Sequence, residues 1–377
     1  MAKKTKLQTE NLPKGITPRI NENRYLGRVT YKGKPYFRYD TNVGRLERTL
    51  NQLRKDLKEG KDVEAGDKTL NEWFDLYLKK YKLKTVKIGT YENYRRHYNY
   101  YIREGIGKKS LKDITVSDIQ DLYNSFDDRG FSQGMIKLVN ATLNGCFIKA
   151  IKNRIIDFNP VIYAEIPKGK PKKKIIALAK DIQQVFLEYA KESYLHGFLR
   201  VALMTGLRRG ELQALKWQDI NFAEKKLYVF HTLIWIERQG YYTDMAKTEH
   251  SVRTIPMNSD LLDYMLELKV IADETGMGKG SNYVFSLPDG KLISRYRVTR
   301  EINKIQEKMK KAGYEVPHFG CHTLRHTYAT RAIENKIEPQ TLKTLLGHAT
   351  LAITMDLYAH VMEDVRIAEM EKLNGTF

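Results

Sequence analysis

Near its N-terminus the chain alternates between apolar and polar residues. Residues 15–20, 24–31 and 35–39 form alternating runs separated by turn residues, and this pattern predicts a small three-stranded sheet. Leucines then recur at helical spacing at positions 46, 50, 53 and 57. One amphipathic helix can therefore cover one face of the sheet.

The two faces of this predicted sheet differ in chemistry. A period of two places Tyr25, Val29 and Tyr31 under the helix, together with Phe37 and Tyr39 of the next strand. The opposite face is then basic and can lie in a major groove of DNA. Its members are Arg24, Arg28, Tyr36 and Arg38. The alternative is a solvated sheet whose charged residues prevent aggregation.

From residue 69 to residue 160 the period becomes helical. The apolar stripes predict a small helical bundle, in which Thr115 caps one helix and residues 135–152 form another. The stripes are Leu70, Trp73, Phe74, Tyr77 and Leu78, and Ile119, Leu122 and Tyr123. Arg95 and Arg96 lie among several tyrosines. Their helix either faces DNA or contributes those tyrosines to the core.

A segment rich in lysine, with proline and glycine, marks the clearest change of composition. It covers residues 167–174 and predicts an interdomain linker, in which Lys172, Lys173 and Lys174 can follow a DNA backbone. A nuclear-localisation tract is the alternative. Beyond the linker the pattern predicts a mixed segment. It has helices over 179–194 and 197–216, strands over 227–236 and 252–256, and further helices to the end.

Composition narrows the choice of partners. Lysine and arginine number 65 of 377 residues against 45 acids, and the net charge of +20 favours nucleic acid or an anionic membrane surface. A mean hydropathy of −0.53 and short apolar runs exclude a spanning helix. No apolar stretch follows the basic N-terminus, so we expect a cytoplasmic protein. Cys146 and Cys321 are too far apart to predict a disulfide framework or a thiolate zinc site.

Five short motifs in the last segment carry cations, proton-transfer groups and a phenol. They cover residues 205–212, 247–256, 322–327, 346–348 and 355–358. Transfer of a phosphoryl group from DNA to a tyrosine requires this set. The guanidinium groups of Arg208 and Arg325 can hold both non-bridging oxygens of a phosphodiester without a metal.

The remaining groups suit proton transfer. His322 lies three residues before Arg325, so both share one helix face and the imidazole can accept a phenol proton. Two nearby arginines would favour the phenolate of Tyr358, whose ordinary pKa of about 10 makes it a poor nucleophile. Lys247 precedes a strand and could reach the leaving 5′-oxygen as a general acid. Taken singly, each residue also fits a solvated or structural role.

The ordered set resembles the tyrosine recombinase (phage-type integrase) family, whose signature is Arg, Lys, His-x-x-Arg, His or Trp, and Tyr. The matching residues are Arg208, Lys247, His322, Arg325, His348 and the nucleophile Tyr358. Glu211 matches the acidic residue that supports the family's active site. The family's first arginine follows Thr-Gly-Leu, which selects Arg208 over Arg209.

The resemblance extends over nearly the whole chain and implies its layout. Residues 1–62 look like an AP2-like arm-binding domain, and residues 63–166 are similar to the SAM-like core-binding bundle. Residues 167–174 are the basic linker between the domains. Residues 175–377 then form the mixed, mainly α-helical catalytic domain with a small antiparallel sheet. The layout resembles that of conjugative-transposon and temperate-phage integrases.

The resemblance further implies a bacterial enzyme that integrates and excises a mobile element. It would act as a homotetramer on core-type and arm-type sites of double-stranded DNA, through a 3′-phosphotyrosyl intermediate and a Holliday junction. No cofactor, metal or membrane is implied. An excisionase and a host DNA-bending protein are partners implied by the resemblance alone. Residues 362–377 resemble the tail that docks on a neighbouring protomer.

Three other functions fit part of the sequence. A non-catalytic DNA-binding regulator would need the basic surfaces but not the full catalytic set. A recombinase that resolves chromosome dimers would share the chemistry but ordinarily lacks the arm-binding segment. A type IB topoisomerase would share the chemistry without strand exchange, and the N-terminal sheet would then have no explanation.

Overall fold

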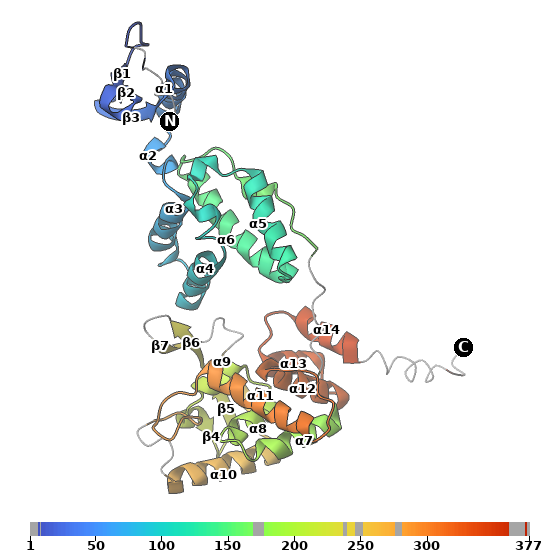
Figure 1. Ribbon diagram of the computed structural model, residues 1–377. Helices are drawn as coiled ribbons and strands as arrows, with labels where there is room; N and C mark the ends of the chain where they lie inside the picture. The colour runs from blue at the N-terminus through green and yellow to red at the C-terminus, as the bar shows by residue number, and fades with distance from the viewer. Residues whose placement is uncertain are drawn as a thin grey trace. The chain divides into compact units, whose positions relative to one another are not determined.

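The structure is a computed structural model that describes residues 7, 9–168, 177–236, 240–245, 252–275, 281–361 and 374. The chain divides into two compact units, Met1–Lys172 and Lys173–Phe377. The first contains a small sheet and a helical bundle, and the second is mainly helical (Figure 1). In the described part of the chain, no helix is both long and apolar enough to cross a bilayer.

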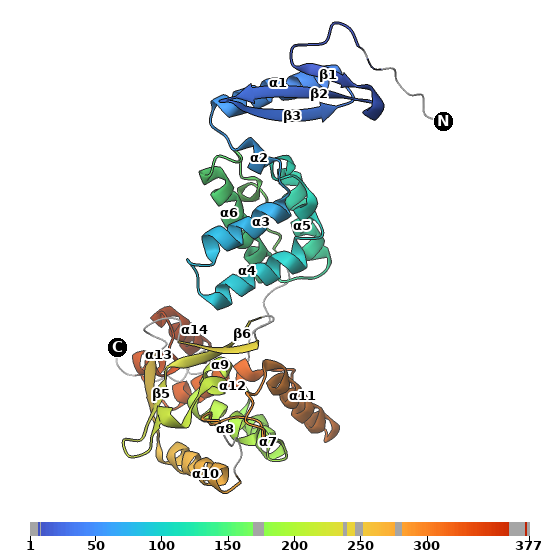
Figure 2. The same ribbon diagram turned by 90° about the vertical axis from the view of Figure 1, so that its left-hand side faces the viewer.

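The N-terminal sheet is antiparallel, in the order β1 (Ile16–Arg19), β2 (Arg24–Tyr31), β3 (Lys34–Asp40). Helix α1 (Val43–Lys58) lies along it (Figure 2). The side chain of Asn42 caps α1 by accepting a hydrogen bond from the backbone N–H of Arg45. All four predicted leucines of α1 are buried against the sheet. The predicted sheet and covering helix are therefore confirmed.

The predicted faces of β3 are wrong. Directly paired residues of neighbouring strands point to the same side of a sheet. Tyr36 pairs with the buried Val29, so Tyr36 and Arg38 lie on the side of α1. Phe37 and Tyr39 lie on the outer face and are 44% and 50% exposed.

The outer face therefore combines aromatic and basic side chains. Arg24 and Arg28 lie on this face as predicted, and both are exposed. The guanidinium carbon of Arg24 lies 4.3 Å from the ring centroid of Tyr39. Of the four residues proposed to contact DNA from this face, only these two arginines are on it.

The helical bundle of the first unit packs around aromatic side chains. Its longer helices are α3 (Leu70–Tyr77), α4 (Ile88–Tyr101), α5 (Val116–Asp128) and α6 (Gln133–Lys152), with the short α2 (Val63–Gly66) before them. A π-helical segment, η2 (Leu78–Lys82), follows α3, and the 3-10 turns are η3 (Ile106–Lys108), η4 (Leu111–Asp113) and η5 (Pro160–Ile162). Thr115 caps α5 through a capping box with Asp118, as predicted.

The second unit is mainly helical with two small antiparallel sheets. Strands β4 (Ile220–Asn221), β5 (Lys226–Val229) and β8 (Arg253–Pro256) form one sheet, and β6 (His231–Ile236) with β7 (Gly240–Met245) forms a hairpin. Its helices are α7 (Lys180–Ala190), α8 (His196–Thr205), α9 (Arg209–Ala214), α10 (Ser259–Thr275), α11 (Arg295–Lys311), α12 (Cys321–Glu334), α13 (Pro339–Leu346) and α14 (Leu351–Val361), with a 3-10 turn, η6 (Trp217–Asp219).

Two predicted elements of this unit are each divided in the structure. The helix predicted over 197–216 breaks at Gly206, whose φ of +62° is left-handed and ends α8. A Cβ at Gly206 would lie 2.4 Å from the ring of Tyr328, so the close approach of α12 also requires glycine. The strand predicted over 227–236 divides into β5 and β6, which pair with different strands.

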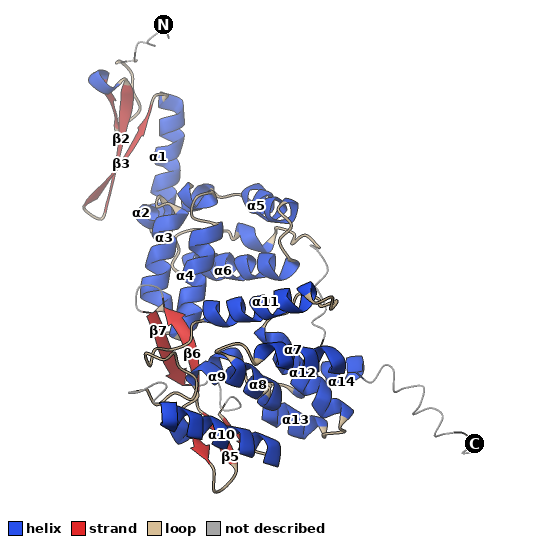
Figure 3. Ribbon diagram, turned by 60° about the horizontal axis from the view of Figure 1, so that its bottom comes forward, coloured by secondary structure: helices blue, strands red, loops and turns tan. Residues whose placement is uncertain are grey.

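Helix α12 lies at the centre of the helices that position the site. It packs against α8, α13 and α14 (Figure 3). The sharp turn at Gly206 leaves Arg208 immediately before α9 and close to the end of α13. Residues far apart in the sequence therefore meet around α12.

Candidate active site

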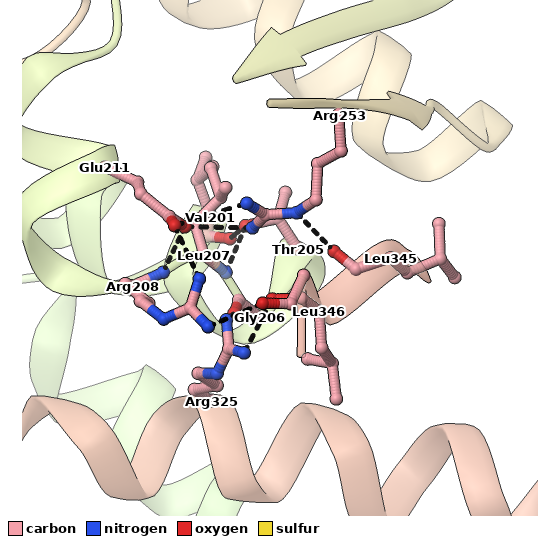
Figure 4. Close-up of polar contacts among 11 residues, drawn as sticks. Val201, Thr205, Gly206, Leu207, Arg208, Glu211, Arg253, Arg325, Leu345 and Leu346 are labelled. Atoms are coloured by element: carbon pink, nitrogen blue, oxygen red, sulfur yellow. Dashed lines mark hydrogen bonds and ion pairs between the residues drawn. The ribbon is translucent and has the colours of Figure 1, made fainter. Parts of the chain in front are cut away.

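The carboxylate of Glu211 is shared by two arginines (Figure 4). Arg208 donates to it from its backbone N–H at 2.9 Å and from Nη1 at 2.8 Å. Arg253 donates from Nη2 at 2.8 Å and from Nη1 at 3.2 Å. Burial alone raises the pKa of Glu211, but the hydrogen bonds and charges of Arg253 and Arg208 outweigh it and lower the pKa. Glu211 is therefore a buried, ionised anchor.

Three arginines bind three successive carbonyl oxygens at the end of α13. Arg253 Nε donates to Leu345 O at 2.7 Å, Arg325 Nη2 to Leu346 O at 2.6 Å, and Arg208 Nη2 to Gly347 O at 2.7 Å. The last carbonyls of a helix lack intrahelical partners and carry partial negative charge. The end of α13 therefore attracts all three guanidinium groups.

Arg325 is the more buried of the two predicted phosphate-binding arginines. Its Nη1 donates to Gly206 O at 2.8 Å, and the residue is only 4% exposed. Burial, followed by the charge of Arg208, lowers the pKa of Arg325. A guanidinium has five N–H donors, so both arginines keep donors beyond the bonds described.

Three histidines of the motifs, His322, His326 and His348, have lowered pKa values. Burial, then the charges of Arg325 and Arg208, lower the pKa of His322 and bring that of His348 to about 4. Burial and the neighbouring His322 lower the pKa of His326 to about 4. His348 Nδ1 lies 2.9 Å from Thr354 Oγ1. Each imidazole is therefore neutral at neutral pH and able to accept or relay a proton.

Tyr358 does not have the environment expected of it. Its hydroxyl donates a hydrogen bond to the carbonyl of Ile337, in the turn between α12 and α13. Burial and the Glu338 carboxylate raise the pKa of Tyr358, whereas the sequence predicted that arginines would lower it. The cause is the packing of α14, which buries the ring against side chains of α12 and α13.

Of the other predicted site residues, some lie outside the described part of the chain and others lie on α4. Lys247, Lys172, Lys173 and Lys174 lie outside the described residues. On α4, Arg95 is half-buried and pairs with Glu92 at 2.7 Å, whereas Arg96 is exposed and bonds Asn93. The tyrosines of α4 also divide, because Tyr98 is fully buried and Tyr100 is 73% exposed.

The sequence analysis gave Arg253 no role. Arg253 and Ile255 are two apart on a strand, so they point to the same side. Since Ile255 is a core residue, Arg253 also points inward and needs a buried partner. That alternation was the available signal for a buried arginine that meets Glu211.

Comparison with known proteins identifies the family. Residues 174–364 match the model of the phage integrase family, and residues 69–126 match that of the phage integrase N-terminal SAM-like domain. A "Tyrosine recombinase XerC-like" protein of Caldanaerobacter subterraneus subsp. tengcongensis is 30% identical, over 92% of this chain and 97% of the relative. The transposase from transposon Tn916 of Enterococcus faecalis is 24% identical, over 92% of each.

Solved structures share the fold. The Tn1549 transposon integrase in complex with transposon right end DNA has a TM-score of 0.69 at 23% identity, over 82% of this chain and all of that one. A lambda integrase tetramer bound to a Holliday junction has a TM-score of 0.59 at 23% identity, over 90% of this chain and 97% of that one.

The chain belongs to the phage integrase family. Within it, the chain is a tyrosine recombinase of the conjugative-transposon and phage type, an enzyme that cleaves and rejoins DNA. Its activity is site-specific recombination of a mobile element. The predicted fold is confirmed as well, with the SAM-like bundle, the small antiparallel sheets and a mainly helical catalytic domain.

Proposed function

We propose that the protein integrates and excises its element through a covalent DNA intermediate on Tyr358. The observation that carries this proposal is the convergence of Arg208 and Arg325 at the end of α13, with guanidinium donors left over. Planar guanidinium groups match the non-bridging oxygens of a phosphodiester and stabilise the charge that develops on them.

The cleavage step balances with the residues named. The Tyr358 oxygen attacks the scissile phosphorus and forms the 3′-phosphotyrosyl bond, while the bond from phosphorus to the 5′-oxygen breaks. His322 accepts the phenol proton, and Lys247 donates a proton to the leaving 5′-oxygen. The reverse step, with a 5′-hydroxyl from another strand, rejoins the DNA. Two such rounds lead through a Holliday junction.

In this mechanism Tyr358 must first leave the Ile337 carbonyl. That carbonyl lies at the start of α13, whereas the arginines lie at the end of that helix. Helix α13 has eight residues, so at about 1.5 Å of rise per residue its two ends are on the order of 12 Å apart. Attack requires contact between the phenol oxygen and the phosphorus, so α14 must be displaced before cleavage.

We also propose the division of labour along the chain. Residues 1–62 bind arm-type sites through the outer face of the sheet, where Arg24 and Arg28 lie beside exposed aromatic rings. Residues 63–166 bind core-type sites, with Arg96 exposed on α4. Residues 167–174 link them to the catalytic residues 175–377. Since DNA is the substrate, the proposed site of action is the bacterial cytoplasm.

We propose the assembly by analogy with one solved relative. The lambda integrase tetramer on a Holliday junction supports a homotetramer of this chain on double-stranded DNA. Strand exchange between two duplexes needs four cleavages, and one Tyr358 per protomer supplies four nucleophiles. An excisionase and a host DNA-bending protein would then bias the direction of the reaction.

Trapping the covalent intermediate tests the proposal. The substrate is a duplex that carries the joined ends of the encoding element and is nicked near the exchange point, so that the cleaved strand diffuses away. We expect wild type to form a DNA adduct that survives SDS, with EDTA present, and Tyr358→Phe to form none while binding the DNA with nearly unchanged affinity. Equal recombination by Tyr358→Phe would refute Tyr358 as the nucleophile. Tight binding by wild type without an adduct would favour a regulator.

A further inference from the structure

The side chain of Arg253 makes hydrogen bonds to two elements other than its own strand. It begins β8, where it pairs with Val229 of β5, and it is 7% exposed. Its two Nη atoms reach both oxygens of Glu211, and its Nε reaches Leu345 O. One side chain therefore joins the sheet, the start of α9 and the end of α13 (Figure 4).

The same side chain also supports the turn after α13. Gly347 has a left-handed φ of +66°, and its carbonyl accepts the bond from Arg208. A Cβ at Gly347 would lie 3.0–3.2 Å from three atoms of Arg253. The Arg253 side chain thus lies directly against the turn whose carbonyl orients Arg208.

The positive charge of Arg253 also affects Arg208, because both arginines share the carboxylate of Glu211. The side chains of Glu211 and Arg253 are 4% and 3% exposed, whereas that of Arg208 is 40% exposed. If Glu211 had only Arg208 as a partner, the carboxylate would cancel the charge that Arg208 offers to an incoming phosphate. Because Arg253 supplies a second guanidinium, the three groups together keep one positive charge, and the exposed member of the three is Arg208.

We propose that Arg253 is a positioning residue for cleavage, which orients Arg208 and preserves its positive charge through Glu211 and the Gly347 turn. This inference rests on the proposed function, in which Arg208 binds the scissile phosphate. Arg253 is itself buried and acts on the phosphate through Arg208.

A substrate with an uncharged scissile linkage separates positioning from general stability. A methylphosphonate carries a methyl group in place of one non-bridging oxygen, so its reaction depends less on the charge of Arg208. A variant that loses only that charge and orientation should be impaired on the phosphodiester and much less on the methylphosphonate. A variant that is merely less well folded should be impaired equally on both.

The experiment measures the rate of covalent adduct formation by the full chain on nicked duplexes with either linkage, together with DNA affinity. We expect Arg253→Met to lower the phosphodiester rate about 100-fold and the methylphosphonate rate by less than about tenfold, with similar DNA affinity. Arg253→Lys keeps the charge but loses the two-oxygen geometry, and it should recover at least about tenfold of the lost rate. If Arg253→Met does not fold, the comparison of the two linkages is made with Arg253→Lys instead.

Arg331 provides a matched control. It also joins a carboxylate to a backbone carbonyl, donating to Glu334 at 2.8 Å and to Leu178 O at 2.5 Å, but on the far part of α12. Arg331→Met should leave the ratio of the two rates at the wild-type value.

The outcomes distinguish this inference from the proposed function. Wild-type phosphodiester rates in Arg253→Met, or equal losses on both linkages, would overturn the positioning role while the wild-type adduct upholds the function. Failure of wild type to form an adduct on the phosphodiester would overturn both.

Discussion

At the scale of single residues, the reactivity of a side chain depends on the groups to which it is hydrogen-bonded. The resemblance to tyrosine recombinases implied that Arg208, Glu211 and Arg325 share one site, and the structure brings them to one end of α13. Spacing could not predict the environment of Tyr358, because its hydrogen bond to Ile337 depends on how α14 packs. Nor could it give Arg253 a partner, since Glu211 lies 42 residues away.

The lowered pKa of His322 predicts a pH profile for cleavage. If the neutral imidazole accepts the phenol proton, the rate falls only where His322 becomes protonated, which burial and the nearby arginines shift below the ordinary value of 6.5. Adduct formation measured between about pH 5 and about pH 8 should therefore be level above 6.5 and decline on the acid side.

His322→Ala identifies the group responsible for that decline. The variant should be slower at every pH and should lose the acid limb, with DNA affinity measured at each pH as the control. A decline centred above 6.5 in wild type, or an unchanged acid limb in His322→Ala, would contradict a base role for His322.

At the scale of elements, periodicity predicted which strands and helices form, but it did not predict which face of β3 is buried. Alternation and leucine spacing were sufficient for the three strands and for α1. They failed for β3 because Phe37 and Tyr39 were taken to be buried as aromatic residues, whereas the pairing of Tyr36 with Val29 places them outside. The helix predicted over 197–216 failed for a similar reason, since the left-handed turn at Gly206 is set by contact with α12. Both errors arise from tertiary contacts.

The corrected faces of β3 predict opposite effects for neighbouring residues. Phe37→Ala removes an exposed ring, so the free energy of unfolding should change by less than about 0.5 kcal/mol while affinity for arm-type DNA falls several-fold. Tyr36→Ala removes a ring that packs against the core under α1 and should destabilise the protein by about 1–3 kcal/mol. Thermal unfolding and DNA titration of both variants check this pair, and the reversed pattern would restore the first assignment.

At the scale of the whole molecule, the chain forms two compact units, Met1–Lys172 and Lys173–Phe377. The resemblance predicted a finer division into three domains and a basic linker, and that division stays a prediction. The DNA sequences read by each part depend on side chains placed in grooves, which periodicity does not specify.

Removing residues 1–62 tests the division. The truncated chain should lose about tenfold or more of its affinity for arm-type sites, and it should still cleave an isolated core site at a rate close to wild type. Gel-shift and adduct assays on separate arm and core duplexes measure the two activities, and both should weaken steeply with salt because phosphate contacts dominate. Undiminished affinity for arm sites would show that the N-terminal sheet is not the arm-binding surface.

The bond between Tyr358 and the Ile337 carbonyl has a consequence for the host chromosome. A strongly basic protein meets far more non-specific DNA than attachment sites as it searches. If Tyr358 is the nucleophile, as proposed, its place at the opposite end of α13 from the arginines would keep a protomer from nicking an ordinary phosphodiester that it encounters. On the proposed mechanism the enzyme would survey a genome without leaving protein-linked breaks, and cleavage would be confined to sites where α14 is displaced.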